Sequence, residues 1–420
     1  MSTSSNKRIV FNIVLSCWLA YTLSMCMKMV YSASMVAIKD EYGISHFIAS
    51  LPITLYYIFY AIIQLFLAAI MKKINMKLYM LITFTFSGLS YVSVFFFSAV
   101  WYVCSVMAIN GITLGAVWCG SIMAFSKYLT KKQMHESLLL MGAGAAVGNA
   151  LSYGISALSM SLENWRLSFF IMGVAFLVST VYMVGTIVRA EKIKLTPDES
   201  PNGTLRKNQV YTAKAYEAKP LVIMAMIVVF FACILYYAFT NWMPTILKND
   251  FGMGNSQATL LTTIFPVAVF FGVYFANVLS DKMKNDFLLT LLSATMVVIL
   301  SLILCFTYRA GAFICVALIV WLGIALRLIT SLNCSLVTLH TRDYFNSGST
   351  ASLINSSACV AAAISPVLIS TILDLSGGNW TTGFIVLFIT AIVLAVVPLV
   401  FLLINIKNTN KINEKNKGEI

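Results

Sequence analysis

The chain has 420 residues, of which 60% are hydrophobic and only 10% are charged, and its formal net charge is +13. A soluble globular protein is about half apolar and about a quarter charged, so this composition excludes an ordinary soluble enzyme or soluble binding domain. It predicts a protein whose surface is largely covered by lipid.

Twelve stretches of the chain are apolar and long enough to cross a bilayer as a helix, which takes about 20 residues. The first stretch lacks a small-residue cleavage site, so we expect it to be retained as a helix rather than removed as a signal. In chain order, the expected helices cover residues 9–36, 46–71, 77–98, 101–126, 137–160, 166–188, 220–246, 256–280, 287–307, 312–337, 347–373 and 381–405. The predicted fold class is an all-α membrane protein with twelve transmembrane helices.

The long polar segment 189–219 divides these helices into two groups of six. The groups resemble each other, because Asn164 and Trp165 precede the sixth helix as Asn379 and Trp380 precede the twelfth, an offset of 215 residues. Such a repeat is typical of secondary transporters, whose substrate site lies near the bilayer midplane at the interface between the repeats. The predicted domains are a six-helix bundle at 1–188, a cytoplasmic linker at 189–219, a second six-helix bundle at 220–406 and a basic cytoplasmic tail at 407–420.

The basic residues are distributed as in a multi-pass protein of the cytoplasmic (inner) membrane with both termini in the cytoplasm. With that orientation, 22 of the 28 lysines and arginines lie in cytoplasmic segments and four in external ones, which follows the positive-inside rule. The basic excess therefore reflects topology and attraction to anionic lipid, and we expect no nucleic-acid partner. Four tryptophans fall at external helix ends, where we expect an aromatic belt: Trp101, Trp165, Trp242 and Trp380.

Two charges fall well inside the expected helices, Lys28 in the first and Arg327 in the tenth, whereas all fifteen carboxylates lie at helix ends or in loops. A charge at the bilayer centre costs about 2.5–3.5 kcal/mol on insertion scales, so it usually marks a pathway or a partner. We interpret the missing anion as the substrate, although either side chain could instead reach toward the interface or bond to carbonyls or water. The lack of a carboxylate or histidine at mid-depth favours exchange or uniport over a proton symporter.

Polar and aromatic residues on the first, second and seventh helices are candidates to share the substrate site. The alternative interpretation of each is an ordinary packing residue. No Cys or His spacing predicts a disulfide framework, a metal site or a cofactor. The glycines at 142, 144 and 148 predict a close helix contact rather than a phosphate-binding loop. The candidate substrate-binding residues are Lys28, Arg327, Tyr21, Tyr60, Gln64, Tyr236, Tyr237 and Asn241.

Three short motifs give the chain a resemblance to a known family: the stretch from Tyr237 to Lys248, with Trp242 and Pro244, the stretch from Tyr31 to Met35, and Ser280-Asp281-Lys282. They resemble motifs of the major facilitator superfamily, and within it most closely those of the organophosphate:phosphate antiporter family. A related Trp-x-Pro-Thr stretch occurs in organic anion:cation symporters. The resemblance implies a secondary transporter that works by alternating access.

The chain departs from this family at the positions that bind phosphate. The family uses one arginine in helix one and one in helix seven, and these positions are Lys28 and Tyr236 here. A helix-five histidine position reads Ala145 and a helix-two lysine position reads Gln64, whereas Tyr21 and Tyr60 match family tyrosines. Since one cation is missing, a carboxylate or a sugar acid is at least as good a candidate as an organic phosphate.

The sequence therefore predicts a monomeric secondary transporter for a small organic anion, not an enzyme. Two alternatives stay open. The first is a transporter-like membrane receptor that binds an organic anion without carrying it, and the second is a proton-coupled drug exporter. The basic loop Met71-Lys72-Lys73 lacks the acidic residue that the resemblance implies, which predicts an altered balance between conformations.

Overall fold

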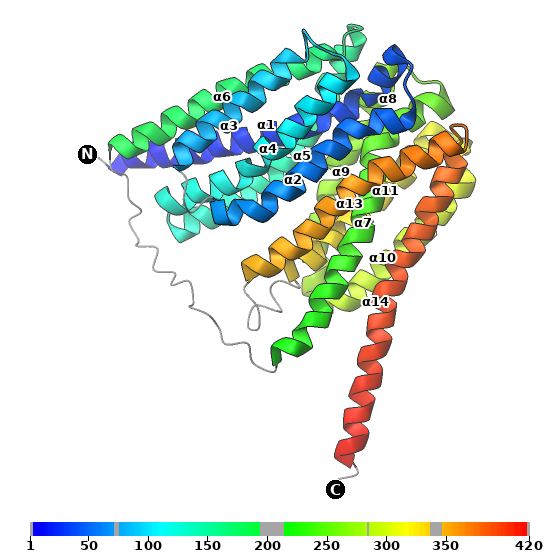
Figure 1. Cartoon of the computed structure of the whole chain (residues 1–420). Helices are drawn as coiled ribbons and strands as arrows, with labels where there is room; N and C mark the ends of the chain where they lie inside the picture. The colour runs from blue at the N-terminus through cyan, green and yellow to red at the C-terminus, as the bar shows by residue number, and fades with distance from the viewer. Residues whose placement is uncertain (1–2, 71–74, 194–213, 284, 337–346, 418–420) are drawn as a thin grey trace. The chain divides into compact units, whose positions relative to one another are not determined.

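The computed structural model describes residues 3–70, 75–193, 214–283, 285–336 and 347–417 (Figure 1). All regular structure in these ranges is helical, and twelve of the helices have 18 residues or more. The elements are α1 (Thr3–Tyr42), α2 (His46–Ile70), α3 (Met76–Ser93), α4 (Val100–Tyr128), α5 (Lys131–Ser161), α6 (Arg166–Lys192), α7 (Lys214–Phe251), α8 (Asn255–Thr262), α9 (Ile264–Met283), α10 (Asp286–Thr307), η1 (Tyr308–Ala310), α11 (Ala312–Ser331), η2 (Leu332–Leu336), α13 (Ser347–Leu375) and α14 (Trp380–Lys417).

The predicted twelve-helix membrane fold is confirmed. Eleven helical segments of the described chain are long and apolar enough to span a bilayer. The long helix outside that set is α3, which has only 18 residues and carries Lys77 together with several serines and threonines. Other helices extend beyond their predicted limits: α1 has 40 residues where the sequence predicts 9–36, since a helix need not end where the bilayer ends.

The predicted helix over 256–280 is interrupted at Thr263, between α8 and α9. Pro266 occupies the third position of α9 and has no backbone N–H, so it cannot bond to the carbonyl one turn earlier, and its ring crowds that carbonyl. A proline within the first turn is tolerated because the N–H groups there have no intrahelical acceptor. The break therefore falls one turn before Pro266 rather than at it.

The described chain forms two compact units. Of the described residues, unit 1 comprises 3–70, 75–193, 240–267 and 366–374, and unit 2 comprises 214–239, 268–283, 285–336, 347–365 and 375–417. Two segments that follow the predicted linker, 240–267 and 366–374, thus pack with the first six helices. The predicted domain limits remain a prediction from the sequence. Near the predicted linker, α6 ends at Lys192 and α7 begins at Lys214, and the predicted tail is helical as far as Lys417. Most of the linker, residues 194–213, and the loop 71–74 lie outside the described ranges.

In unit 1, α1 is the central helix and packs against α2, α4, α5, α6 and α8. Its contact with α5 depends on two of the three glycines that the sequence singled out. A Cβ atom on Gly144 would lie 2.6 Å from Oγ1 of Thr22, and one on Gly148 would overlap the carbonyl oxygen of Thr22. Gly142 is exposed and a Cβ atom there would have no neighbour within 4 Å. The predicted helix contact is confirmed for Gly144 and Gly148 but is wrong for Gly142.

We expect Gly148→Ala to lower the stability of the protein, because the methyl group would push α5 away from the backbone of α1. Overpacking of this kind costs about 1–3 kcal/mol. The matched control is Gly142→Ala on the same helix, which should leave stability unchanged or raise it by up to about 1 kcal/mol through helix propensity. Thermal unfolding of the two purified variants would measure the difference, and equal melting temperatures would contradict the packing argument.

In unit 2, α10 packs against both α11 and α14. α9 approaches α11 closely, since a Cβ atom on Gly272 would lie 2.5 Å from the carbonyl oxygen of Ile324 and 2.9 Å from Cβ of Arg327. α11 then passes directly into the π-helical turn η2 (Leu332–Leu336). Within that turn, Nδ2 of Asn333 donates to the carbonyl of Ile329 at 2.9 Å. π-Helical turns are rare and often lie at functional sites.

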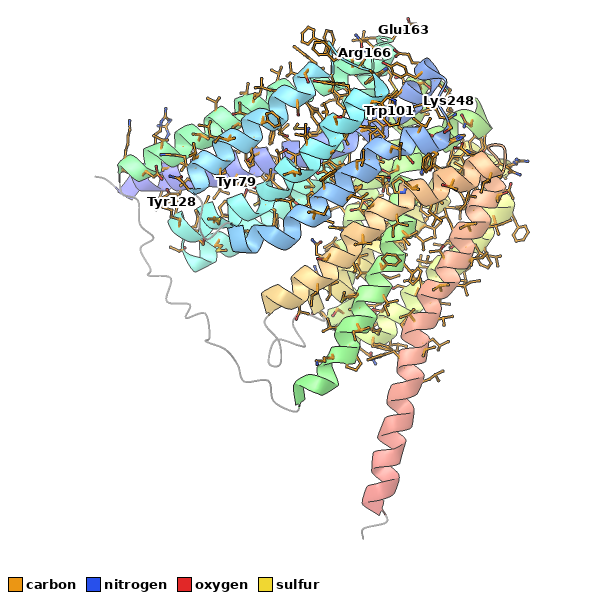
Figure 2. The ribbon with its side chains drawn as sticks, in the orientation of Figure 1. Tyr79, Trp101, Tyr128, Glu163, Arg166 and Lys248 are labelled. Atoms are coloured by element: carbon orange, nitrogen blue, oxygen red, sulfur yellow. The ribbon has the colours of Figure 1, made fainter. Side chains whose placement is uncertain are left out.

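The two ends of unit 1 carry different polar residues (Figure 2). Trp101, Glu163, Arg166 and Lys248 lie toward one end, and Tyr79 and Tyr128 lie toward the other. Trp101 is 68% exposed, as expected for an aromatic belt.

Trp165, Trp242 and Trp380 are 3% or less exposed, so their assignment to an aromatic belt was wrong. Their indoles pack inside the protein, and Nε1 of Trp165 donates to Glu41 at 2.6 Å. A tryptophan near a helix end faces lipid only where no other helix end covers it, and sequence position does not show that.

Candidate functional site

Lys28 lies in the middle of α1, where its side chain is half-buried. Its Nζ is 5.4 Å from the centroid of the Tyr57 ring on α2. Tyr57 is only 2% exposed, so its ring is fixed by its surroundings. A cation over an aromatic face within about 6 Å is attracted by the quadrupole of the ring, by about 2 kcal/mol when the pair is shielded from water. The structure therefore holds the ammonium group of Lys28 at a defined place within unit 1.

Aromatic side chains continue from this pair along α1 and α2. Tyr56 lies edge-on to Tyr57, with ring centroids 5.3 Å apart, and stacks on Tyr60 at 5.9 Å. On α1, Tyr21 precedes Lys28 by seven residues, which is close to two helical turns, so both side chains project from the same side of the helix. The Tyr21 ring packs against Trp118 of α4, with centroids 5.1 Å apart.

Arg327 lies well inside α11, yet its side chain is exposed. It is within electrostatic range of Tyr236, Tyr237 and Cys233 on α7, and of Cys334 in η2. Tyr237 is also within range of Cys359 on α13. Arg327 and these side chains of α7 and η2 therefore lie in the same part of unit 2.

The phenols near Arg327 have a fixed relation to each other. The Tyr236 and Tyr237 rings meet edge to face, with centroids 5.2 Å apart, and both side chains are half-buried. A planar guanidinium group with five N–H donors beside two hydroxyls is suited to the oxygens of a carboxylate or a phosphate.

The ion pairs of the described residues are all near helix ends, and none of them includes Arg327. Within the described part of the chain, Arg327 thus has no carboxylate partner, in agreement with the distribution of charges along the sequence. The pairs are His46–Asp374, Lys77–Glu191, Lys127–Glu191, Arg166–Glu41 and Lys248–Asp40.

Asn241 occupies a different environment from the other candidates on α7. It belongs to unit 1, is fully buried, and its Oδ1 accepts a hydrogen bond from Oγ of Ser32 on α1 at 2.7 Å. The preceding carbonyl, that of Thr240, accepts a hydrogen bond from the Tyr153 hydroxyl of α5. Among the described residues, Nδ2 of Asn241 has no hydrogen-bond partner. Asn241 therefore lies in a packed contact between α7 and α1.

The structure brings the sequence-based candidates together in two sets. In unit 1, Lys28 lies over Tyr57, which is one of three neighbouring tyrosines of α2 together with Tyr56 and Tyr60. Tyr21 lies about two turns before Lys28 on α1. In unit 2, Arg327 is within electrostatic range of Tyr236 and Tyr237. Gln64 is in α2, but its side chain lies outside the described part of the chain.

Tyr57 and Trp118 were not among the sequence-based candidates, although they contact Lys28 and Tyr21. A signal for Tyr57 was present, because it precedes Tyr60 by three residues and so lies on the same side of the helix. For Trp118 no signal was present, since contact with Tyr21 depends on how α4 packs against α1. In the part of the chain that the structure describes, no group of three His, Cys, Asp or Glu residues is placed to hold a metal ion.

The chain matches known proteins in sequence family and in fold. A family model described as Major Facilitator Superfamily matches residues 17–366 and 225–419. Comparison with curated proteins gives no match. A bacterial homologue of the human lysosomal transporter Spinster, in an inward-facing and unoccupied conformation, is similar with a TM-score of 0.72 and 13% identity over 95% of this chain and 96% of that one. A D-xylose-proton symporter is similar with a TM-score of 0.71 and 13% identity over 93% and 97% of the two chains.

Proposed function

Because the chain belongs to the major facilitator superfamily of membrane transporters, we propose that it carries a small organic anion across the cytoplasmic membrane by alternating access. The family membership makes it a secondary transporter with a small-molecule substrate, and not an enzyme. The proposed substrate is an organic phosphate, a carboxylate or a sugar acid. The proposed relatives within the superfamily are the organophosphate:phosphate antiporters, on the motifs around Trp242 and Pro244.

The observation that carries this proposal is the environment of Arg327. A guanidinium group stays protonated in proteins, so it cannot avoid the cost of lying within a membrane-spanning helix by losing its charge. Here it is exposed in the middle of a membrane-spanning helix, beside two phenols, and outside every ion pair of the described residues. An incoming anion would offset its charge and would also accept hydrogen bonds from its N–H groups.

Lys28 supports the same substrate class from unit 1. An ammonium group held over a tyrosine ring keeps its charge at a defined point, but it lacks the planar fork of an arginine. We propose that in unit 2 Arg327 supplies directional hydrogen bonds, with hydroxyl groups from Tyr236 and Tyr237, and that in unit 1 Lys28 supplies charge, with hydroxyl groups from Tyr21 and Tyr60. One fork and one point charge suit a monoanionic carboxylate or sugar acid at least as well as a phosphate dianion.

The distribution of basic residues supports an orientation with both termini in the cytoplasm. In that orientation the end of unit 1 with Trp101, Glu163, Arg166 and Lys248 is external (Figure 2). The basic residues at the other end, such as Lys77 and Lys127, would then lie near anionic lipid headgroups. We further propose that the protein acts as a monomer.

A ligand screen by thermal unfolding tests the substrate class directly. The purified protein would be heated with single phosphorylated or carboxylated metabolites, and with neutral analogues of the same size. A ligand that binds only the folded state stabilises it by about 2.7 kcal/mol at a concentration 100 times its Kd. We expect the melting temperature to rise with at least one organic anion and with none of the neutral analogues.

A matched screen with Arg327→Gln separates specific binding from a general effect of salt. Stabilisation by the anion should vanish in this variant, while stabilisation by added lipid should remain. If neutral sugars or organic cations stabilised the protein and no anion did, the proposed substrate class would be wrong.

A further inference from the structure

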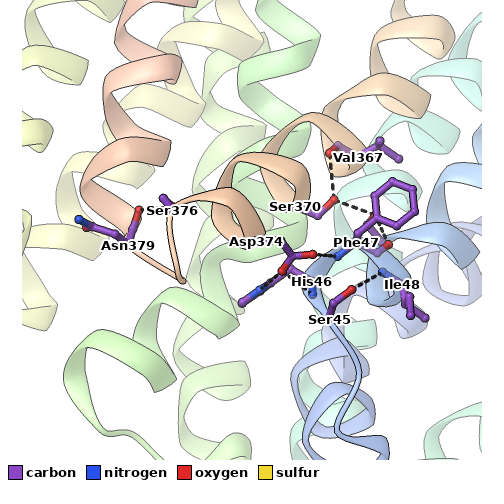
Figure 3. A network of polar contacts seen from close by, with 10 residues as sticks. Ser45, His46, Phe47, Ile48, Val367, Ser370, Asp374, Ser376 and Asn379 are labelled. Carbon is purple, nitrogen blue, oxygen red and sulfur yellow. Dashed lines mark hydrogen bonds and ion pairs between the residues drawn. The ribbon is translucent and has the colours of Figure 1, made fainter.

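The amino terminus of α2 is capped by a carboxylate that comes from α13 (Figure 3). Oδ1 of Asp374 accepts the backbone N–H of His46 at 3.0 Å and lies 2.8 Å from Nδ1 of the same residue. Oδ2 accepts the backbone N–H of Phe47 at 2.9 Å. The next N–H, that of Ile48, bonds to Oγ of Ser45 at 3.3 Å. Asp374 therefore supplies two of the partners that the first turn of α2 needs.

A second contact follows one helical turn deeper. Ser50 lies four residues after His46 and Ser370 lies four residues before Asp374, and their Oγ atoms are 3.0 Å apart. Both serines are fully buried. The two helices thus contact each other at two successive levels, first through a carboxylate and then through two hydroxyls. We call these two levels the Asp374 junction.

Other contacts of unit 1 join the same sets of helices. The ring of His46 lies 5.8 Å from that of Trp242 on α7, and Lys248 of α7 pairs with Asp40 of α1. On α8, Oγ1 of Thr259 donates to the carbonyl of Ala33 in α1 at 3.2 Å. In each contact one partner lies before residue 189 and the other after residue 219, on opposite sides of the predicted linker.

A negative charge at a helix amino terminus is favourable because it satisfies free N–H groups and interacts with the helix dipole. α2 receives this charge from a segment 328 residues away in sequence. When α13 withdraws, the N–H groups of His46 and Phe47 lose their acceptor, and Ser45 caps only the N–H of Ile48. The free energy of the cap is thus available only while Asp374 stays against His46 and Phe47.

We propose that Asp374 is a positioning residue of the transport cycle, which holds one end of the transporter closed by capping α2. Its release allows α2 and α8 to separate from α13 and α1, respectively, when that end opens. The inference rests on the alternating access proposed above but not on the identity of the substrate. In this proposal Asp374 controls the opening of one end, whereas Lys28 and Arg327 bind the substrate.

Cysteine reactivity in the purified full-length protein tests this role without any substrate. The nine native cysteines would first be replaced, and single cysteines would be introduced at two buried positions, Ser50→Cys and Thr259→Cys. The probe is a water-soluble maleimide, which reacts only when the thiol is exposed. We expect Asp374→Ala to raise the labelling rate at both positions about tenfold, because hydrogen bonds to a charged group are lost.

Two further variants show how much of the change in labelling rate depends on the charge of Asp374 and how much on the side chain of His46. Asp374→Asn keeps one carbonyl acceptor but no charge, so its labelling rates should lie between those of the parent and of Asp374→Ala. His46→Ala keeps both backbone N–H groups on the carboxylate and should change the rates less than Asp374→Asn does.

The matched control is Ser168→Cys in α6, which is fully buried and whose native hydroxyl lies 3.3 Å from that of Ser34 in α1. Both of these residues precede the linker, so their contact need not open, and labelling there should not change. Unchanged labelling at all positions would overturn the proposal. So would a rise at Ser50→Cys alone, which would mean local fraying, or an equal rise at Ser168→Cys, which would mean a loosened fold.

Discussion

Arg327→Gln is expected to abolish transport of the organic anion while leaving the protein inserted and folded. A bidentate arginine–carboxylate contact consists of two charge-assisted hydrogen bonds, each of about 1.5–3 kcal/mol, so its loss weakens binding by at least about 100-fold. Insertion should not suffer, because removing a charge from mid-membrane saves about 2.5–3.5 kcal/mol on insertion scales. The measurement is counterflow of the anion found in the ligand screen, in proteoliposomes that contain equal amounts of protein.

Two matched variants show whether the loss of transport in Arg327→Gln depends on the guanidinium group and on its position. Arg327→Lys keeps the charge without the planar fork, and we expect partial transport with weaker binding. Arg309→Gln removes an arginine from the same unit at a helix end, where Nε of Arg309 donates to the Tyr308 hydroxyl at 2.8 Å, and we expect full transport. Normal counterflow by Arg327→Gln would remove the central argument for an anionic substrate.

Lys28→Gln is expected to reduce transport by one to two orders of magnitude, because the substrate would lose its interaction with a half-buried positive charge. Charge-assisted hydrogen bonds are roughly twice as strong as neutral ones, and an amide retains only a neutral donor. Lys28→Arg should retain part of the activity, since charge rather than a fork is needed at this position. The control is Lys7→Gln, at the exposed start of the same helix, which should transport normally in the same counterflow assay.

The ring beneath Lys28 offers a separate test of how the charge is held. Tyr57→Phe keeps an aromatic face and should preserve most transport, whereas Tyr57→Leu removes the cation–π contact and should weaken binding by about 0.5–2 kcal/mol. If both variants were equally active, the position of Lys28 would not depend on the ring. If both were inactive, the Tyr57 hydroxyl itself would be required.

Most of the helical architecture could be predicted from the chain alone, but helix ends and interruptions could not. The first helix was expected to cover 9–36 and covers Thr3–Tyr42, because hydropathy reports where lipid is, whereas hydrogen bonding decides where a helix ends. At Tyr42 the helix ends because Gly43 adopts a positive φ of 59°, and the N–H of Ile44 bonds back to the carbonyl of Lys39. The interruption at Thr263 likewise depends on backbone geometry near Pro266.

The two cations among the candidate residues could be found from sequence, and the neighbours of each only in part. Lys28 and Arg327 stand out because a charged residue in a long apolar stretch has few explanations. Tyr236 and Tyr237 were candidates as polar aromatic residues of the seventh helix, and both are within electrostatic range of Arg327. Tyr57 and Trp118 were missed, since many aromatic residues occur in these helices and few of them approach a charge.

The sequence by itself determined that this protein is embedded in a membrane, has twelve helices, and carries two positively charged residues well inside apolar helical stretches. Those properties depend on transfer free energies, which each residue carries wherever it packs. The tertiary structure decided which ring lies beneath Lys28, which phenols lie by Arg327, and that Asp374 caps a helix 328 residues away. Helices in lipid associate through shape and hydrogen bonds rather than hydrophobicity, so hydropathy does not predict which helices pack together.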